Sequence, residues 1–136
     1  MKEWFEGKTV AVVGNAMALF KKQHGDEIDS HDVVVRLNKA AMLYTRMDVK
    51  LSHGKKTNVW VFWSTSEYKS FFSKIPGHVK KMHAGHQART PNNIHAIDFV
   101  YPESLYKPLK LKSGRHRNPT TGLITLDYIS TCNPKN

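Results

Sequence analysis

Cysteine is almost absent from this sequence of 136 residues. Cys132 stands alone, so no internal disulfide can form, and such usage suits a reducing cytoplasm. Long apolar runs are also missing, since none approaches the roughly 18 residues that a membrane-spanning helix needs. The first six residues contain no apolar signal core. These absences favour a cytoplasmic protein with no transmembrane segment.

Acidic residues are scarce, with 11 Asp and Glu against 21 Lys and Arg, which gives a net charge of +10. This excess favours anionic partners: nucleotides, phosphorylated glycans, nucleic acid or an acidic membrane surface. The charge does not choose among them. Because the basic residues are scattered along the chain, a solvated basic surface is the alternative interpretation.

Internal repeats and low-complexity linkers are lacking too, so we expect one domain over residues 1–136. Apolar, β-branched runs predict strands at residues 8–14, 32–38 and 57–63, with short strands within 78–84 and 94–101. A loop follows at residues 102–114. Strands that alternate with helices predict an α/β domain with a mainly parallel sheet.

Three helices are expected between and after these strands. The first carries the apolar residues Met17 and Phe20 and ends at Gly25. The second starts at Ser64, which stands in capping-box spacing with Glu67, and runs to residue 74. The third follows the sequence NP at residues 118–119, with the asparagine as N-cap and the proline at the first helical position.

Glycine is too sparse around the first strand for a familiar phosphate-binding loop. Residues 8–20 read KTVAVVGNAMALF, with one glycine and no Gly-Lys-Ser/Thr ending. Gly14 permits a sharp turn and close backbone approach, and the Asn15 amide both donates and accepts hydrogen bonds. Open α/β sheets bind ligands at the carboxyl ends of their strands, so this turn is a candidate site. An ordinary strand-ending turn is the alternative.

The second strand carries two polar residues, Arg36 and Asn38, at alternate positions. Alternate residues of a strand face the same side, and buried polar groups need partners. One interpretation pairs Arg36 with an acidic neighbour such as Asp29. The other places Asn38, at the end of the strand, in the same crevice as Asn15.

A third candidate feature is the sequence RHRNPTTG at residues 115–122. Thr120, Thr121 and Gly122 fall in the first turn of a predicted helix, where free backbone N–H groups and the helix dipole favour an anion. Two hydroxyls and three nearby basic side chains suit a phosphate. A capped helix beside a solvated basic loop is the alternative.

These stretches together resemble the sialyltransferases, glycosyltransferase family 29. The sequences VAVVGNA at residues 10–16 and IDSHDVVVRLNKA at 28–40 are similar to the large sialylmotif of that family. PTTG at residues 119–122 is similar to the small sialylmotif, and GKKTN at 54–58 to the family's G-x-K-T segment. The similarity touches nearly the whole chain, and the large motif is the specific part.

The resemblance implies a Rossmann-like domain of the glycosyltransferase-A-variant type. It implies a CMP-sugar donor, typically CMP-sialic acid, transferred with inversion to the hydroxyl of a glycan or other acceptor, anionic or neutral, and no metal cofactor. Carried over position by position, the residues that contact the donor nucleotide are Gly14, Asn15, Asn38, Thr120, Thr121 and Gly122.

Three departures from the family pattern are visible. Val10 stands where the large motif opens with a cysteine, which leaves Cys132 unpaired, and Met17 replaces a glycine, which would reshape the donor pocket. The late element that carries the family's catalytic histidine has no counterpart before Asn136, so we expect a fragment or a shortened form. His116 is then the candidate general base, although it lies between two arginines and equally suits the flank of an anion site.

Two other functions are alternatives to donor binding and transfer. The missing histidine element would fit a catalytically inactive nucleotide-binding or interaction module. The basic charge would fit a nucleic-acid-binding protein, but Trp60, Phe62 and Trp63 lie in an apolar strand, where core packing argues against that role. A metal site at His83 and His86 lacks further ligands, which argues against metal binding.

Overall fold

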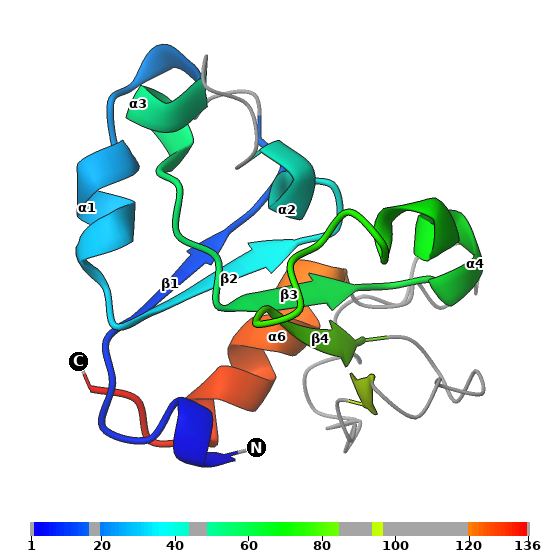
Figure 1. Cartoon of the computed structure of the whole chain (residues 1–136). Coiled ribbons are helices and arrows are strands. Elements are labelled where there is room, and N and C mark those ends of the chain that lie inside the picture. The colour runs from blue at the N-terminus through cyan, green and yellow to red at the C-terminus, as the bar shows by residue number, and fades with distance from the viewer. Residues whose placement is uncertain (1, 17–19, 44–48, 85–93, 97–119, 136) are drawn as a thin grey trace, which may run out of the picture.

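Five strands form one parallel sheet in the computed structural model, which describes residues 2–16, 20–43, 49–84, 94–96 and 120–135 (Figure 1). Every pair of neighbours in the sheet is parallel. The spatial order is the order of the chain: β1 (Val10–Val13), β2 (Val33–Leu37), β3 (Val59–Phe62), β4 (Lys80–His83) and β5 (His95–Ala96). This is an α/β, Rossmann-like domain, as the alternating pattern predicts.

Helices cover both faces of the sheet (Figure 1). The connections between successive strands carry α1 (Gly25–Ser30), α2 (Ala40–Leu43), α3 (Lys50–His53), α4 (Thr65–Tyr68) and the 3₁₀ helix η4 (Lys69–Phe71). The other face is covered by α6 (Thr121–Ser130) and the 3₁₀ helix η1 (Lys2–Trp4). Each successive strand lies on the same side of the one before it, and crossovers between parallel strands are right-handed. All the connecting helices therefore lie on one face of the sheet, which leaves the other face to α6 and η1.

Side chains of β2 alternate between these two layers. Val33, Val35 and Leu37 pack with Ile124 and Ile129 of α6. Val34 instead packs with residues of β1 and α1. All five residues of β2 are buried, as expected of a strand in a parallel sheet with helices on both faces, and all but Arg36 are apolar.

The aromatic residues of β3 belong to the core. Trp60 and Phe62 are fully buried, their ring centroids lie 4.6 Å apart, and Tyr68 and Phe72 pack against them. This confirms their expected role in packing and leaves them unavailable for stacking on nucleic-acid bases.

The end predicted for the first helix, at Gly25, is wrong. Residues 17–19 lie outside the described part, Phe20 is 40% exposed, and Gly25 begins α1 rather than ending a helix. The cause is a non-local contact: a Cβ on Gly25 would lie 2.2 Å from the Lys50 carbonyl oxygen of α3. Glycine is needed here for close packing of two helices.

The other two helices have the predicted character but shifted ends. Ser64 caps α4 as predicted, with its Oγ accepting from the Glu67 backbone N–H at 3.3 Å, but α4 ends at Tyr68 and continues only as η4. The N-cap of the last helix, α6, is Thr120, two residues later than predicted. Residues 118–119 lie outside the described part.

The described part contains no helix whose length and apolar character would let it cross a membrane. Cys132 is buried as a free thiol in the layer beneath α6. Of the short strand expected within residues 94–101, the structure describes β5. Residues 97–101 and the loop expected at residues 102–114 lie outside the described residues.

Candidate functional site

The first candidate element is the turn that follows β1. Gly14 is half-buried and Asn15 is exposed. A Cβ on Gly14 would meet no heavy atom within 4 Å, so open space lies above this backbone. The turn therefore leaves room for a ligand to approach the main chain, and the Asn15 amide is accessible beside it.

Asn38 is the second element, and hydrogen bonds with β3 and the residue that follows it fix its position. Its backbone is left-handed, with φ of 49°, and its N–H donates to the Val61 carbonyl at 2.7 Å. Its own carbonyl accepts from Trp60 Nε1 at 2.9 Å, and its side-chain Oδ1 accepts from the Trp63 N–H at 3.2 Å. Within the described ranges no group accepts from Asn38 Nδ2, so this half-buried amide offers a donor with a fixed position.

The start of α6 is the third element. Thr120 is exposed, and its Oγ1 accepts from the Leu123 N–H at 3.2 Å. Thr121 is buried, and its carbonyl accepts from Thr125 Oγ1 at 2.7 Å. The N–H groups of Thr121 and Gly122 lie in the first turn, where the helix dipole is positive. This end of α6 is suited to a phosphate.

These three elements share the carboxyl edge of the sheet. Val13 of β1 pairs with Arg36 of β2, and Asn15 and Asn38 each come two residues after one member of this pair. A Cβ on Gly122 would lie 3.4 Å from Leu37 Cδ1, so the first turn of α6 contacts the last residue of β2. The topology brings the predicted residues to one edge, although no hydrogen bond within the described part joins the three elements to one another.

Arg36 does not form the ion pair with Asp29 that one interpretation predicted. Its side chain is fully buried, and Nε donates to Thr57 Oγ1 at 2.8 Å and to the Lys56 carbonyl at 3.1 Å. Nη2 donates to the His53 carbonyl at 2.7 Å. Burial lowers the pKa of Arg36, and the charge of Asp29 opposes that shift. Through these hydrogen bonds, Arg36 holds the end of α3 and the segment after it against the sheet.

Asp29 fastens the same segment from α1. Its carboxylate accepts from the Lys55 N–H at 2.7 Å and from the Lys56 N–H at 2.8 Å. Gly54 has φ of 69°, and a Cβ there would lie 2.3 Å from Asp29 Oδ1. Asp29 and Arg36, both from the sequence IDSHDVVVRLN, thus hold the GKKT segment at residues 54–57. Both motifs therefore stabilise the fold that supports the candidate site.

Ser52 and His53 are buried polar residues that the sequence did not single out. Ser52 Oγ donates to the Val49 carbonyl at 3.0 Å, so it accepts from His53 Nδ1 at 2.6 Å. Nε2 of His53 and Nη1 of Arg36 are both buried without a partner in the described structure. Burial, and then the charge of Arg36, lower the pKa of His53. No local pattern marks His53, since its burial and its nearness to the Arg36 charge come from the fold.

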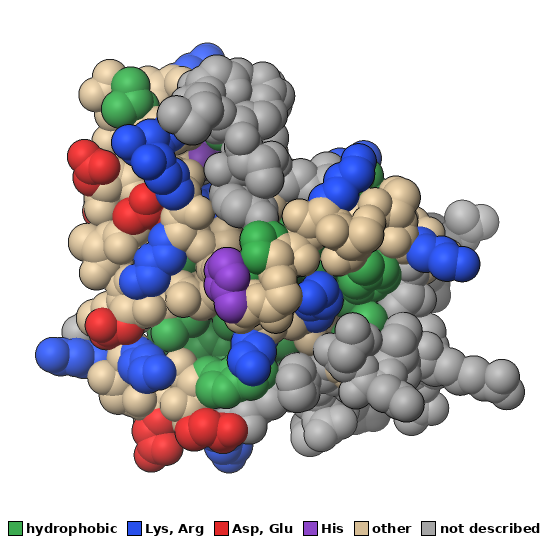
Figure 2. Space-filling model, viewed as in Figure 1, with side chains coloured by type: hydrophobic (Ala, Val, Ile, Leu, Met, Phe, Trp, Pro, Cys, Tyr) green, Lys and Arg blue, Asp and Glu red, His purple; other side chains and the backbone are tan. Residues whose placement is uncertain are grey.

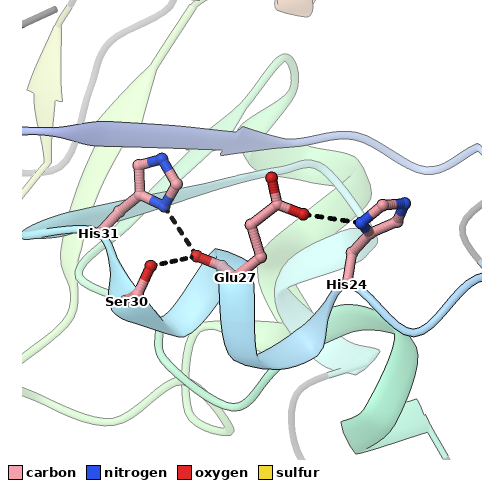
Figure 3. Close-up of polar contacts among 4 residues, drawn as sticks. All are labelled: His24, Glu27, Ser30 and His31. Atoms are coloured by element: carbon pink, nitrogen blue, oxygen red, sulfur yellow. Dashed lines mark hydrogen bonds and ion pairs between the residues drawn. The ribbon is translucent and has the colours of Figure 1, made fainter.

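A second polar group lies on α1, facing β1 (Figure 3). His24 Nδ1 lies 2.7 Å from Glu27 Oε2, and His31 Nδ1 lies 2.9 Å from the Glu27 carbonyl. These side chains border a cavity of about 340 Å³ that is also lined by residues of β1. His31 is the C-cap of α1. No group of three metal ligands occurs in the part of the chain that is described.

The remaining predicted residues are placed as follows. His116, the candidate base, lies outside the described residues, as do Met17 and His86. His83 is buried with its ring centroid 5.5 Å from that of Phe62, and burial lowers its pKa.

The fold and this polar edge define an α/β, Rossmann-like domain with polar residues at the carboxyl ends of its strands. The family model described as glycosyltransferase family 29 (sialyltransferase) matches residues 5–101, more than half of the chain. The chain therefore belongs to this family. The match includes Gly14, Asn15 and Asn38, whereas the start of α6 lies beyond it.

Two curated relatives match shorter stretches. The chain is 47% identical over 49 residues to beta-1,6-galactosyltransferase GALT29A of Arabidopsis thaliana, which covers 36% of this chain and 11% of that protein. It is 43% identical over 53 residues to CMP-N-acetylneuraminate-beta-galactosamide-alpha-2,3-sialyltransferase 1 of Gallus gallus, which covers 39% of this chain and 14% of that protein. The similarity thus spans a small part of each relative.

Proposed function

We propose that the carboxyl edge of the sheet binds the nucleotide of a CMP-sugar, of the CMP-sialic acid type, as the donor site of a glycosyltransferase. The observation that carries this proposal is the meeting of Asn15, Asn38 and the first turn of α6 in a chain of family 29. The helix start supplies N–H groups for the phosphate, and the two amides supply hydrogen bonds for the rest of the nucleotide.

In the proposed transfer, an acceptor hydroxyl oxygen attacks the anomeric carbon on the face opposite the phosphate. The bond from that carbon to the phosphate oxygen breaks, the configuration inverts, and CMP leaves with the bonding electrons. The positive end of α6 stabilises the charge that develops on the leaving phosphate. A general base takes the hydroxyl proton, and His116 remains the candidate for it; no metal ion is invoked. The acceptor is a glycan or another hydroxyl compound, anionic or neutral.

The transferred sugar is the finer part of the proposal. One relative is named for galactose transfer and the other for transfer from CMP-N-acetylneuraminate. We favour the CMP-linked donor because the large sialylmotif carries the two asparagines that the family resemblance assigns to cytidine. We also propose a reducing, cytoplasmic setting, which suits the buried free thiol of Cys132.

Nucleotide selectivity tests the proposal. Isothermal calorimetry of the wild-type chain with CMP, UMP and AMP should give saturable CMP binding, about tenfold tighter than binding of either control, which corresponds to about 1.4 kcal/mol. Equal affinities, or no CMP binding at millimolar concentration, would contradict a cytidine site.

Catalysis needs a separate assay, because the described residues at this edge carry amides and hydroxyls, which are not general bases at neutral pH. Release of CMP from CMP-N-acetylneuraminate, with and without galactosides as acceptors, measures it directly. CMP binding without release would identify a nucleotide-binding module that does not catalyse transfer.

A further inference from the structure

A second cleft lies at the amino edge of the sheet, opposite the proposed donor site. It encloses about 200 Å³ and is floored by the first residues of β2 and β3. Its polar and aromatic lining consists of Trp4, Lys8, Asp32, Asn58, His78 and Lys80. None of these residues belongs to the proposed donor site.

Two lysines line this cleft, and the charges of two more act on its residue Asp32. Lys8 and Lys80 line it directly, and Lys80 Nζ lies 5.0 Å from the centroid of the Trp4 ring, which fixes the cation by a cation–π contact. Lys135 is brought close because its N–H donates to the Lys8 carbonyl at 2.9 Å. Lys56 reaches the same region, where its Nζ donates to the His31 carbonyl.

Negative charge at this edge is limited to one carboxylate among the lining residues. Asp32 Oδ2 accepts from the Thr9 N–H and from Thr9 Oγ1, both at 2.8 Å, so its lone pairs are partly used. These hydrogen bonds lower the pKa of Asp32, with smaller contributions from the charges of Lys56 and Lys135. The cleft thus keeps an excess of positive charge.

The surface view agrees with this charge distribution. Figure 2 shows Lys and His side chains across the middle of this face, around the amino end of β3, with acidic side chains toward its left and lower margins. Clustered like charges repel one another, so the folded chain gains free energy when an anion sits among them.

A neutral donor completes the lining. Asn58 Oδ1 accepts from the Val34 N–H at 2.8 Å, which fixes the side chain with its Nδ2 as the remaining donor. The exposed ring of His78 stands in the same lining. Cations, an amide N–H and an imidazole around a cavity of this size fit a small anion with several acceptor oxygens.

We propose that this amino-edge cleft is a binding site for a tetrahedral oxyanion, a phosphate or sulfate group, held by Lys8, Lys80, His78 and the Asn58 amide. The group is either a free ion or a substituent on a carbohydrate. The site is independent of the proposed donor site, because the two lie at opposite edges of the sheet.

Amide chemical shifts of the full chain, titrated with inorganic phosphate, galactose 6-sulfate and galactose, test this site. Saturable shifts of Lys8, Asn58 and Lys80 are expected with phosphate or with the sulfated sugar, and none with galactose. Tighter binding of galactose 6-sulfate than of phosphate would assign the group to a carbohydrate, and the reverse would assign a free ion.

Matched variants separate a built site from general charge. Lys8→Gln and Lys80→Gln, both exposed, should each raise the dissociation constant about three- to fivefold. The control Lys69→Gln removes an exposed lysine from η4, outside the cleft, and should leave binding unchanged. Shifts that do not saturate, or equal weakening by Lys69→Gln, would overturn the proposal. CMP binding should be the same in all three variants, which keeps this test separate from that of the donor site.

Discussion

Arg36 illustrates how a motif residue acts through the scaffold. Its guanidinium is buried among neutral acceptors: two backbone carbonyls and the Thr57 hydroxyl. A buried cation without a paired carboxylate is costly, and it is retained where other groups depend on its hydrogen bonds. Here those acceptors belong to the end of α3 and the segment that connects it to β3, so the guanidinium holds this segment in place.

Replacing Arg36 should therefore destabilise the fold. Arg36→Met leaves the His53 and Lys56 carbonyls and the Thr57 hydroxyl without their donor, and we expect it to lower the free energy of unfolding by about 2–4 kcal/mol. Urea denaturation measures this value. Lys39→Met, at an exposed position next to Asn38, is the control and should change it by less than about 0.5 kcal/mol. An equally stable Arg36→Met variant would show that the network contributes nothing.

His53 should make stability depend on pH. Its pKa is lowered in the folded chain, so between neutrality and its folded pKa the unfolded chain binds more protons. The free energy of unfolding should fall as the pH drops from about 7 through the ordinary histidine value of about 6.5 and below.

Urea midpoints at three pH values between 7 and 5 test this dependence. His53→Asn keeps a donor near the Nδ1 position and cannot take up a proton, so it should flatten the pH dependence. Some dependence should remain, because burial lowers the pKa of His83 as well. An unchanged pH dependence in the variant would show that His53 does not contribute to the pH dependence of stability.

At the scale of elements, α1 and α3 are held together by close backbone approach at Gly25. A Cβ at this position would meet the carbonyl oxygens of Lys50 at 2.2 Å and Leu51 at 2.7 Å. Those are backbone atoms of another helix, so relief requires that the helices separate. The arrangement also positions Asp29, which ends up against the segment after Gly54.

Gly25→Ala should cost about 1–3 kcal/mol of unfolding free energy through this overpacking. Gly77→Ala is the matched control, because a Cβ there meets nothing within 4 Å and the backbone is not left-handed. It should stay within about 0.5 kcal/mol of wild type in the same urea experiment. Similar values for the two variants would show that α1 and α3 adjust without strain.

The sequence predicts the strands better than the helices. Runs such as DVVVRLN and TNVWVFW are β-branched and apolar enough to specify buried parallel strands, and β2 and β3 lie within them. The helices depend on contacts between distant segments. Gly25 looks like a helix end locally, but its role is set by α3, which lies some 25 residues away in the chain.

The candidate site was likewise predictable only in part. Parallel strands end at one edge, so the polar residues that follow β1 and β2 are expected to be neighbours. The left-handed backbone of Asn38 and its bond from the Trp63 N–H come from the packing of β3 and have no local signal. The same holds for Arg36, whose partners lie at the end of α3 and in the segment after it.

At the scale of the whole molecule, the two edges of the sheet differ in chemistry. The carboxyl edge presents amides, hydroxyls and a helix start, whereas the amino edge presents lysines around a small cleft. The family match covers the strands that build both edges. The central claim concerns the carboxyl edge, where the donor nucleotide is proposed to bind.

Calorimetric titration of CMP into wild type, Asn15→Ala and Gln23→Ala tests that claim most directly. Asn15 and Gln23 are both exposed, so neither variant should unfold, and each loses one side-chain amide. The account predicts that Asn15→Ala raises the dissociation constant about tenfold, as expected for the loss of about 1.4 kcal/mol of hydrogen bonding, and that Gln23→Ala matches wild type. Equal CMP affinity in Asn15→Ala and wild type would contradict a donor site at this edge.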